Sequence, residues 1–318
     1  MGAAEAAAVG AAVAAAAEGP PGVLPAPVAG LGVGWRPEIA GVVARLPDLG
    51  FCEVIAESLD LRHPDRPPAG PSRGVTDLRG RGIPVVPHGV RLGLGDAEGV
   101  DPGRVAHLAA CARALDAPLV SEHVAFVRAA GREAGHLLPV PRTREALDVL
   151  VEGVRRTQAE LEVPLALEPI AALFDWPDDE YAEGDFLTEL LDRTGALLLL
   201  DVANVHANAR NRGQDPSAVL DRMPLGRVAY VHVAGGAVHD GLYHDTHLDP
   251  VPSAVLMLLE EVRERGAAPA VMLERDGRYP PAAELRGELA AIVASARLGP
   301  IPSAPSETVP SASPEPVP

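Results

Sequence analysis

The sequence predicts an α/β protein built around one large (β/α)8 barrel, a TIM barrel. Eight short apolar runs alternate with longer segments in which apolar residues recur at helical spacing. The chain has 318 residues, 47% of them hydrophobic, and a barrel of this kind commonly needs about 250 residues. A doubly wound open sheet is the competing architecture. It is disfavoured because the segment after the first apolar run, GVGWRPEIA, is not a convincing phosphate-binding loop.

Both ends of the chain are predicted to lie outside the barrel. Residues 1–25 are rich in Ala, Gly and Pro, and residues 299–318 form a Pro/Ser-rich stretch that is unable to bury a core. We therefore expect disordered segments at 1–25 and 299–318 and a barrel domain at 26–298. The first 18 residues lack the basic region of a signal peptide and carry Glu5 and Glu18, so we do not interpret them as one.

The predicted strands are short and apolar throughout, as buried parallel strands are. In chain order they span residues 29–35, 51–57, 83–88, 117–123, 163–168, 196–201, 228–233 and 269–274. The clearest predicted helices are 143–161, with charges on one face, and 252–266. The second of these begins near a proline and ends at a glycine, which is typical of helix termini.

Composition excludes several classes of function. A net charge of -17 argues against a nucleic-acid-binding surface, which needs clustered Arg and Lys. The chain contains no lysine, which rules out Schiff-base chemistry and a P-loop. No apolar run approaches the roughly 20 residues that cross a membrane. Cys52 and Cys111 are too few for a disulfide framework or a thiolate zinc site. We expect them to be core residues of a cytoplasmic protein.

Ionisable residues stand at the carboxyl ends of nearly all the predicted strands. These ends converge on one rim of a parallel barrel, where the chemistry of such enzymes takes place. Burying several carboxylates together is costly without a cation. Imidazole and carboxylate without thiolate suit iron, manganese or zinc. The residues are Glu57, His88, Glu122, His123, Glu168, Asp201, His232 and Glu274.

The segment AYVHVAGGAVHDGLYHDTHLDP, residues 229–250, holds four of the ten histidines. Asp245 and His247 have the alternating spacing that points two side chains the same way in an extended segment. We therefore expect them to join His232 at the metal site. His206 and Asn204 are predicted to contact either the metal ligands or the substrate.

Three further residues have predicted supporting roles. Glu57 and Glu122 are expected to orient the metal-binding imidazoles, as metal-site histidines usually require. Arg36, near the end of the first strand, is expected either to bind a substrate carboxylate or backbone carbonyl or to form a structural ion pair.

At these residues the sequence resembles a known family, the multinuclear non-haem iron-dependent oxygenases, which includes the catalytic subunit of methanobactin biosynthesis. The resemblance runs from about residue 30 to 290. The motifs, in the family's order, are GVGWRPE, EVIAES, PHGVRLGLG, SEHVAF, LLPVPRTREALD, LALEP, LLLDVANVHANARN, VHVAG, HDTHLDPVP and MLERD.

The resemblance implies a TIM barrel that holds two or three iron ions of mixed valence. It also implies use of O2 to oxidise cysteine or another residue of a ribosomally made precursor peptide, which a separate partner protein commonly recognises. The implied ligands are His88, His123, Glu168, Asp201, His232, Asp245, His247 and Glu274.

The sequence departs from the family's pattern at three positions. Ala203 and Pro169 each stand where the family usually has Asn, and Gly236 where it often has His. Two other functions remain open at this point. One is a divalent-metal isomerase or phosphodiesterase on a xylose-isomerase-like barrel, and the other is a non-catalytic metal-binding scaffold.

Overall fold

The computed structural model describes residues 27–47, 49–61, 72–267 and 270–298. The predicted disordered segments at 1–25 and 299–318 lie outside these residues. Among the described residues, no helix is long and apolar enough to cross a membrane.

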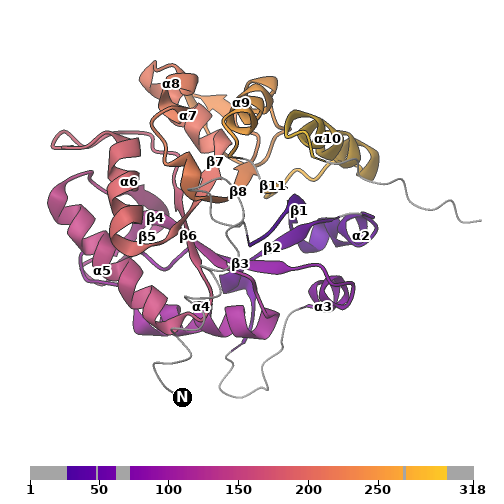
Figure 1. The fold of residues 1–318 in the computed structure, drawn as a ribbon, viewed down its shortest axis with the longest axis horizontal. Helices are drawn as coiled ribbons and strands as arrows, with labels where there is room; N and C mark the ends of the chain where they lie inside the picture. Colours follow the sequence, from indigo (N-terminus) through magenta and orange to yellow (C-terminus); the bar gives the residue numbers. More distant parts are fainter. Residues whose placement is uncertain (1–26, 48, 62–71, 268–269, 299–318) are drawn as a thin grey trace, which may run out of the picture.

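Eight parallel strands form a closed barrel, which confirms the predicted fold (Figure 1). The order around the barrel is β3-β2-β1-β11-β8-β7-β6-β4, and a β3–β4 pairing closes the ring. Each of the eight predicted strands corresponds to one barrel strand, although the bounds differ. The strands are β1 (Gly30–Gly34), β2 (Phe51–Ile55), β3 (Val85–Gly89), β4 (Val120–Ala129), β6 (Leu165–Pro169), β7 (Leu197–Asp201), β8 (Val228–Val233) and β11 (Ala270–Leu273).

Helices follow the strands along the chain and surround the barrel (Figure 1). The predicted helices 143–161 and 252–266 correspond to α5 and α9. Thr143 caps α5 by accepting a hydrogen bond from Ala146 N, and Gly266 follows α9 with a φ of 79°. The α-helices are α2 (Ala40–Val43), α3 (Arg73–Gly80), α4 (Pro102–Leu115), α5 (Arg144–Glu160), α6 (Glu183–Thr194), α7 (Val202–Arg212), α8 (Pro216–Leu220), α9 (Ser253–Glu264) and α10 (Ala282–Ser295). The 3-10 helices are η1 (Pro37–Ile39), η2 (Ala56–Ser58) and η3 (Leu225–Arg227).

Two hairpins were not predicted from the sequence. Strand β4 continues beyond the rim to Ala129 and pairs with the antiparallel strand β5 (Arg132–Pro139). In the loop after β8, strand β9 (Ala237–His239) pairs with β10 (Leu242–His244). Each pair is joined by two residues with positive φ, Ala130–Gly131 and Asp240–Gly241. This backbone is that of a type I′ turn, which suits the twist of a tight hairpin.

The interior of the barrel is filled by alternate residues of the strands. Phe51, Val86, Leu199, Tyr230 and Met272 belong to one buried cluster inside the ring. Because side chains alternate along a strand, the residue two positions further on also points inward and lies nearer the carboxyl end. A second, larger cluster of buried residues fills the space between the strands and the helices.

Candidate metal centre

Because side chains alternate along each strand, the polar residues at the strand ends lie at the rim, directly above the apolar interior. His88 follows Val86 by two positions, and Asp201 follows Leu199 in the same way. Strand pairing then sets neighbours side by side, because His123 is in register with Glu168 and Asp201 with His232. His88, Glu168, Asp201 and His232 are at most 1% exposed.

Four groups of potential ligand atoms lie at this rim, found among the residues that the structure describes. They share members, so they form one continuous centre rather than separate sites. The groups are His88–His123–Glu168, Glu168–Asp201–His232–Glu274, Asp201–Asp245–His247 and His247–Glu274–Asp276. All eight residues predicted as ligands are brought together here, and Asp276 joins them.

The spacing of the ligand atoms is slightly wider than that of groups around a shared ion. Oε2 of Glu168 lies 3.5 Å from His88 Nε2 and 3.4 Å from His123 Nε2. Two ligand atoms that each bind one ion at about 2.1 Å, at tetrahedral or octahedral angles, are roughly 3.0–3.4 Å apart. The same carboxylate approaches His232 with its other oxygen, Oε1, which lies 3.6 Å from Nδ1. The two oxygens of Glu168 thus face different imidazoles.

Several atoms of the centre are buried without a hydrogen-bond partner. They are Glu168 Oε2, Asp201 Oδ2, His232 Nδ1 and Asp245 Oδ1. A buried polar atom without a partner costs free energy, and native structures contain few of them. Four such atoms in one cluster of imidazoles and carboxylates are the arrangement expected of a metal centre. The residues present therefore fit one or more transition-metal ions.

The pKa values of several groups in the centre lie far from their usual ranges. Burial alone would lower the pKa of His123, but the charges of Glu168 and Glu122 outweigh it and raise this pKa to about 9. Burial also raises the pKa of Asp201 well above its usual value, and the neighbouring Asp245 and Glu168 raise it further. Like charges that are crowded in this way favour a bound cation.

The loop after β8 supplies Asp245 and His247, as predicted. Nε2 of His247 makes a short contact with Asp245 Oδ2, and its Nδ1 lies 3.4 Å from Glu274 Oε2. The backbone of His247 has a φ of 55°, a left-handed conformation that is uncommon for a residue other than glycine. Such conformations cluster at functional sites.

The two glutamates predicted to orient imidazoles accept hydrogen bonds from backbone N–H groups, and His123 Nδ1 bonds to Gly89 O at 3.1 Å. Glu122 Oε1 lies 3.6 Å from His123 Nδ1, while Oε2 accepts a hydrogen bond from Leu92 N. Glu57 stands in η2, beyond the end of β2, and accepts hydrogen bonds from Val90 N instead of an imidazole. The prediction that it orients an imidazole therefore has no hydrogen bond to support it.

Arg36, Asn204 and His206 lie around the centre in different ways. Arg36 forms ion pairs with Asp276 and Glu274, the structural alternative of the two considered for it. Asn204 donates from Nδ2 to Pro169 O at 3.1 Å and to Glu168 Oε1 at 3.5 Å. His206 is outside the four groups found in the described part of the chain and packs edge-on against the ring of Tyr243.

The departures Ala203, Pro169 and Gly236 are accommodated locally. Ala203 N donates to Asp201 Oδ1, and the carbonyl of Pro169 accepts from Asn204. Gly236 N donates to the hydroxyl of Tyr243, and a Cβ at Gly236 would lie 2.3 Å from His244 O. A side chain at this position is thus excluded by the β9–β10 hairpin.

Sequence reasoning missed four residues of the centre's surroundings. Glu53 and Ser121 lie within strands and not at their ends, and Tyr230 resembles an ordinary core residue. Asp276 follows the last strand by three residues. Glu53 could have been found, because it is the one charged residue inside the apolar run FCEVI and shares the inward phase of Phe51.

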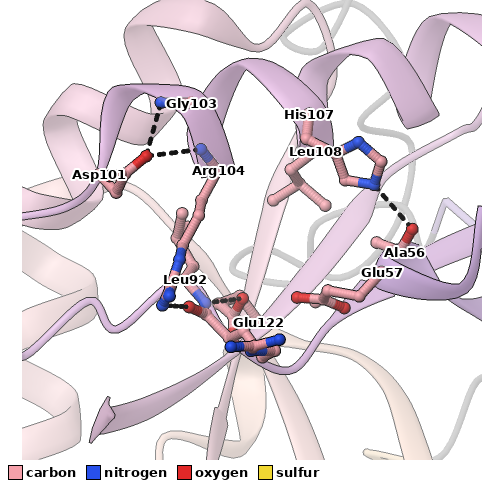
Figure 2. A pocket seen from close by; sticks show the side chains of 11 residues that line it. Ala56, Glu57, Leu92, Asp101, Gly103, Arg104, His107, Leu108 and Glu122 are labelled. Carbon is pink, nitrogen blue, oxygen red and sulfur yellow. Dashed lines mark hydrogen bonds between the residues drawn. The ribbon is translucent and has the colours of Figure 1, made fainter. Parts of the chain in front are cut away.

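A cavity of about 290 Å³ lies between the barrel rim and helix α4 (Figure 2). Glu57 and Glu122 line it from the barrel rim, and Arg104, His107 and Leu108 line it from α4. Figure 2 shows that Asp101 accepts hydrogen bonds from Gly103 N and Arg104 N at the start of α4. None of the residues of the four groups lines this cavity, although Glu122 contacts His123.

Comparison with known proteins assigns the family. The family model of the RiPP precursor modification enzymes MbnB/TglH/ChrH matches residues 30–297. The chain belongs to this family. Its members modify precursors of RiPPs, which are ribosomally made peptides, so the resemblance noted from the motifs is confirmed at the level of the family.

Relatives by sequence are UPF0276 proteins. One from Streptomyces avermitilis is 53% identical over 270 residues, which cover 83% of this chain and 54% of that protein. The chain thus spans about half the length of this relative. Another, from Caulobacter vibrioides, is 36% identical, with 83% of this chain and 92% of that protein covered.

Solved structures with the same fold include sugar epimerases. D-psicose 3-epimerase from Clostridium cellulolyticum has a TM-score of 0.53 at 12% identity, covering 84% of this chain and 98% of that chain. The 3-keto-D-glucoside 4-epimerase YcjR from E. coli has a TM-score of 0.54 at 13% identity, covering 83% and 98%. At such low identity the likeness concerns the fold alone.

Proposed function

We propose that this MbnB/TglH/ChrH family member is an iron-dependent oxygenase that oxidises cysteine, or another residue, of a precursor peptide. The observation that carries the proposal is the continuous centre of imidazoles and carboxylates, in which Glu168, Asp201, His247 and Glu274 each belong to two groups. Shared ligands of this kind suit two or three adjacent ions. Nitrogen and oxygen donors without thiolate suit iron.

The assignment of ligands follows from the groups. His88, His123 and Glu168 would hold one ion, and Glu168, Asp201, His232 and Glu274 a second. Asp245 and His247 would complete a third position with Asp201. When bound, iron of mixed valence would supply electrons for the reduction of O2 and would lower the pKa of a substrate thiol.

The exposure of the ligands indicates the side from which substrate enters. The side chains of His123 and His247 are 11% and 17% exposed, whereas those of Glu168 and His232 are at most 1% exposed. The peptide would therefore approach over His123 and His247. The enclosed side excludes water, which strengthens the electrostatic interactions among the buried ligands.

A separate partner protein for peptide recognition also belongs to the proposal. The resemblance noted from the motifs supports it, because members of the family commonly work with a partner protein that recognises the precursor peptide.

The test begins with the metal. Protein expressed with iron and purified without oxygen is analysed for metal content and by Mössbauer spectroscopy. Two or more irons per chain, with coupled ferrous and ferric signals, are expected.

The loaded protein is then given cysteine-containing synthetic peptides in an oxygen electrode, and O2 consumption that depends on the peptide is expected. His123→Ala should abolish it, and His136→Ala, which removes an exposed imidazole on β5 outside the four groups, is the matched control.

The same measurements decide between this proposal and its alternatives. Turnover with Mg2+ or Zn2+ and without O2 would replace it with a divalent-metal isomerase or phosphodiesterase, whose fold is that of the epimerases above. Tight binding of metal or peptide without any turnover would identify a metal-binding scaffold.

A further inference from the structure

A chain of four hydrogen bonds runs beneath the centre and joins two of the proposed ligands. His88 Nδ1 lies 2.8 Å from Ser121 Oγ, and Ser121 Oγ lies 2.7 Å from the hydroxyl of Tyr230. That hydroxyl lies 2.6 Å from Glu53 Oε2, which in turn lies 3.0 Å from His232 Nε2. All five residues are at most 2% exposed.

The direction of the hydrogen bonds follows from the chemistry of the groups. The carboxylate of Glu53 only accepts, so Tyr230 donates its hydroxyl hydrogen to Glu53 and His232 donates from Nε2. The oxygen of Tyr230 then accepts from Ser121, and the oxygen of Ser121 accepts from His88 Nδ1. Every hydrogen of the chain has an acceptor in this arrangement.

The remaining nitrogen of each imidazole faces the carboxylates of the centre. His88 Nε2 lies 3.5 Å from Glu168 Oε2, and His232 Nδ1 lies 3.1 Å from Glu274 Oε2. His232 Nδ1 has no hydrogen-bond partner. The two histidines therefore present different nitrogens to the centre, Nε2 in His88 and Nδ1 in His232.

We infer that Glu53, Tyr230 and Ser121 are positioning residues that fix the tautomers of His88 and His232 through one shared hydrogen-bond chain. The inference rests on the proposal that both histidines bind metal. Partners of this kind orient a ligating imidazole and raise its basicity. Glu53 bonds directly to His232 and is linked to His88 through Tyr230 and Ser121. Because the two imidazoles belong to different groups, these hydrogen bonds couple the two metal positions.

The test uses three conservative variants. Tyr230→Phe keeps the buried ring and breaks the chain at its middle, Ser121→Ala removes the acceptor of His88, and Glu53→Gln removes the charge. Each is titrated anaerobically with Fe2+ in competition with a chelator. A loss of affinity of about 10- to 100-fold is expected, as for other such partners of metal ligands. Thr157→Val, which removes a buried hydroxyl that bonds only within α5 to Gly153 O at 2.9 Å, should bind as the wild type does.

Coupling and tautomers provide readouts that a merely structural role would not change. The effects of Ser121→Ala and Glu53→Gln should be non-additive in the presence of Tyr230 and additive in the Tyr230→Phe background. In Zn2+-loaded protein with 15N-labelled histidine, nitrogen chemical shifts should place the metal on Nε2 of His88 and Nδ1 of His232.

The outcomes separate this inference from the proposed function. Wild-type affinity in Tyr230→Phe, or metal on the opposite nitrogens, would overturn the inference and leave the oxygenase proposal standing. The expected affinities and nitrogens without any O2 consumption would support the inference and contradict the oxygenase. A wild-type protein that binds no metal would overturn both.

Discussion

At the scale of single residues, the proposed centre depends most on Glu168. Its two oxygens face three imidazoles, those of His88, His123 and His232. Asn204 donates to the same carboxylate, which restricts its rotation. The side chain thus has a fixed orientation before any ion binds, which is the condition for a precise metal site.

We expect Glu168→Gln to lose at least one metal ion per chain, because the amide removes the negative charge that two groups share. Metal content after anaerobic loading and desalting measures this. Glu57→Gln, whose carboxylate bonds to Val90 N at the same rim, is the control and should keep the wild-type content. A full complement of metal in Glu168→Gln would contradict the assignment of this residue.

Individual residues of the centre could be predicted because an ionisable residue at the end of an apolar strand is a strong local signal. His88, Glu168 and Asp201 all stand in such positions. Glu53 and Tyr230 could not be recognised in the same way, because their partners lie 109 or more positions away in the sequence, as the Tyr230–Ser121 and His232–Glu53 bonds show. Only the closed ring brings them together.

At the scale of elements, Asp201 joins the centre to the start of α7. Its Oδ1 caps the helix by accepting from Ala203 N and Asn204 N, while Oδ2 has no hydrogen-bond partner and faces the centre. One side chain therefore carries a structural function on one oxygen and a proposed metal-binding function on the other.

These two functions should separate in two variants. Asp201→Asn keeps a capping oxygen and removes a charge that Asp245 and Glu168 repel, so the metal-free protein should be at least as stable as the wild type. Asp201→Ala also loses the cap, which costs about 0.5–2 kcal/mol. Urea unfolding in the presence of a chelator measures the difference. Both variants should bind less metal, and equal stability of the two would contradict the capping function.

Packing inside the barrel imposes a further requirement, a glycine on β1. A Cβ at Gly32 would lie 2.4 Å from the ring of Phe51 on the adjacent strand. We expect Gly32→Ala to destabilise the protein by about 1–3 kcal/mol through overpacking. Thermal or urea unfolding measures this loss.

A smaller side chain at position 51 should make room for the Cβ that Gly32→Ala introduces. Phe51→Leu is therefore expected to recover part of the stability lost in Gly32→Ala. Gly80→Ala is the matched control, because a Cβ there meets nothing within 4 Å. Additive effects of Gly32→Ala and Phe51→Leu would show that the two residues do not compete for this space.

Elements outside the barrel were harder to predict than its strands. The β9–β10 turn carries Asp-Gly, a strong signal for a two-residue hairpin, but its strands are only three residues long. The β4–β5 hairpin has a mostly exposed second strand, so it lacks the apolar run that identified the barrel strands. Apolar patterns find buried strands, and these hairpins are largely outside the core.

At the scale of the whole molecule, the barrel gathers buried negative charge that an ion would neutralise. We therefore expect chelation of the as-purified protein to lower its unfolding temperature and re-addition of Fe2+ to restore it. A ligand at about 100 times its Kd stabilises a protein by about 2.7 kcal/mol. Differential scanning calorimetry without oxygen measures the shift, and Glu168→Gln should show a smaller one. An unchanged midpoint in the wild type would contradict metal binding at the rim.

The order of the strands around the ring has a consequence for biosynthesis. The proposed ligands come from five strands, from the loop after β8 and from Glu274, which directly follows β11. That strand inserts between β1 and β8, so the first and last parts of the barrel become neighbours only when it docks. A nascent chain that lacks β11 also lacks Glu274 and cannot form the complete centre. Assembly of the proposed centre thus follows the synthesis of nearly the entire barrel.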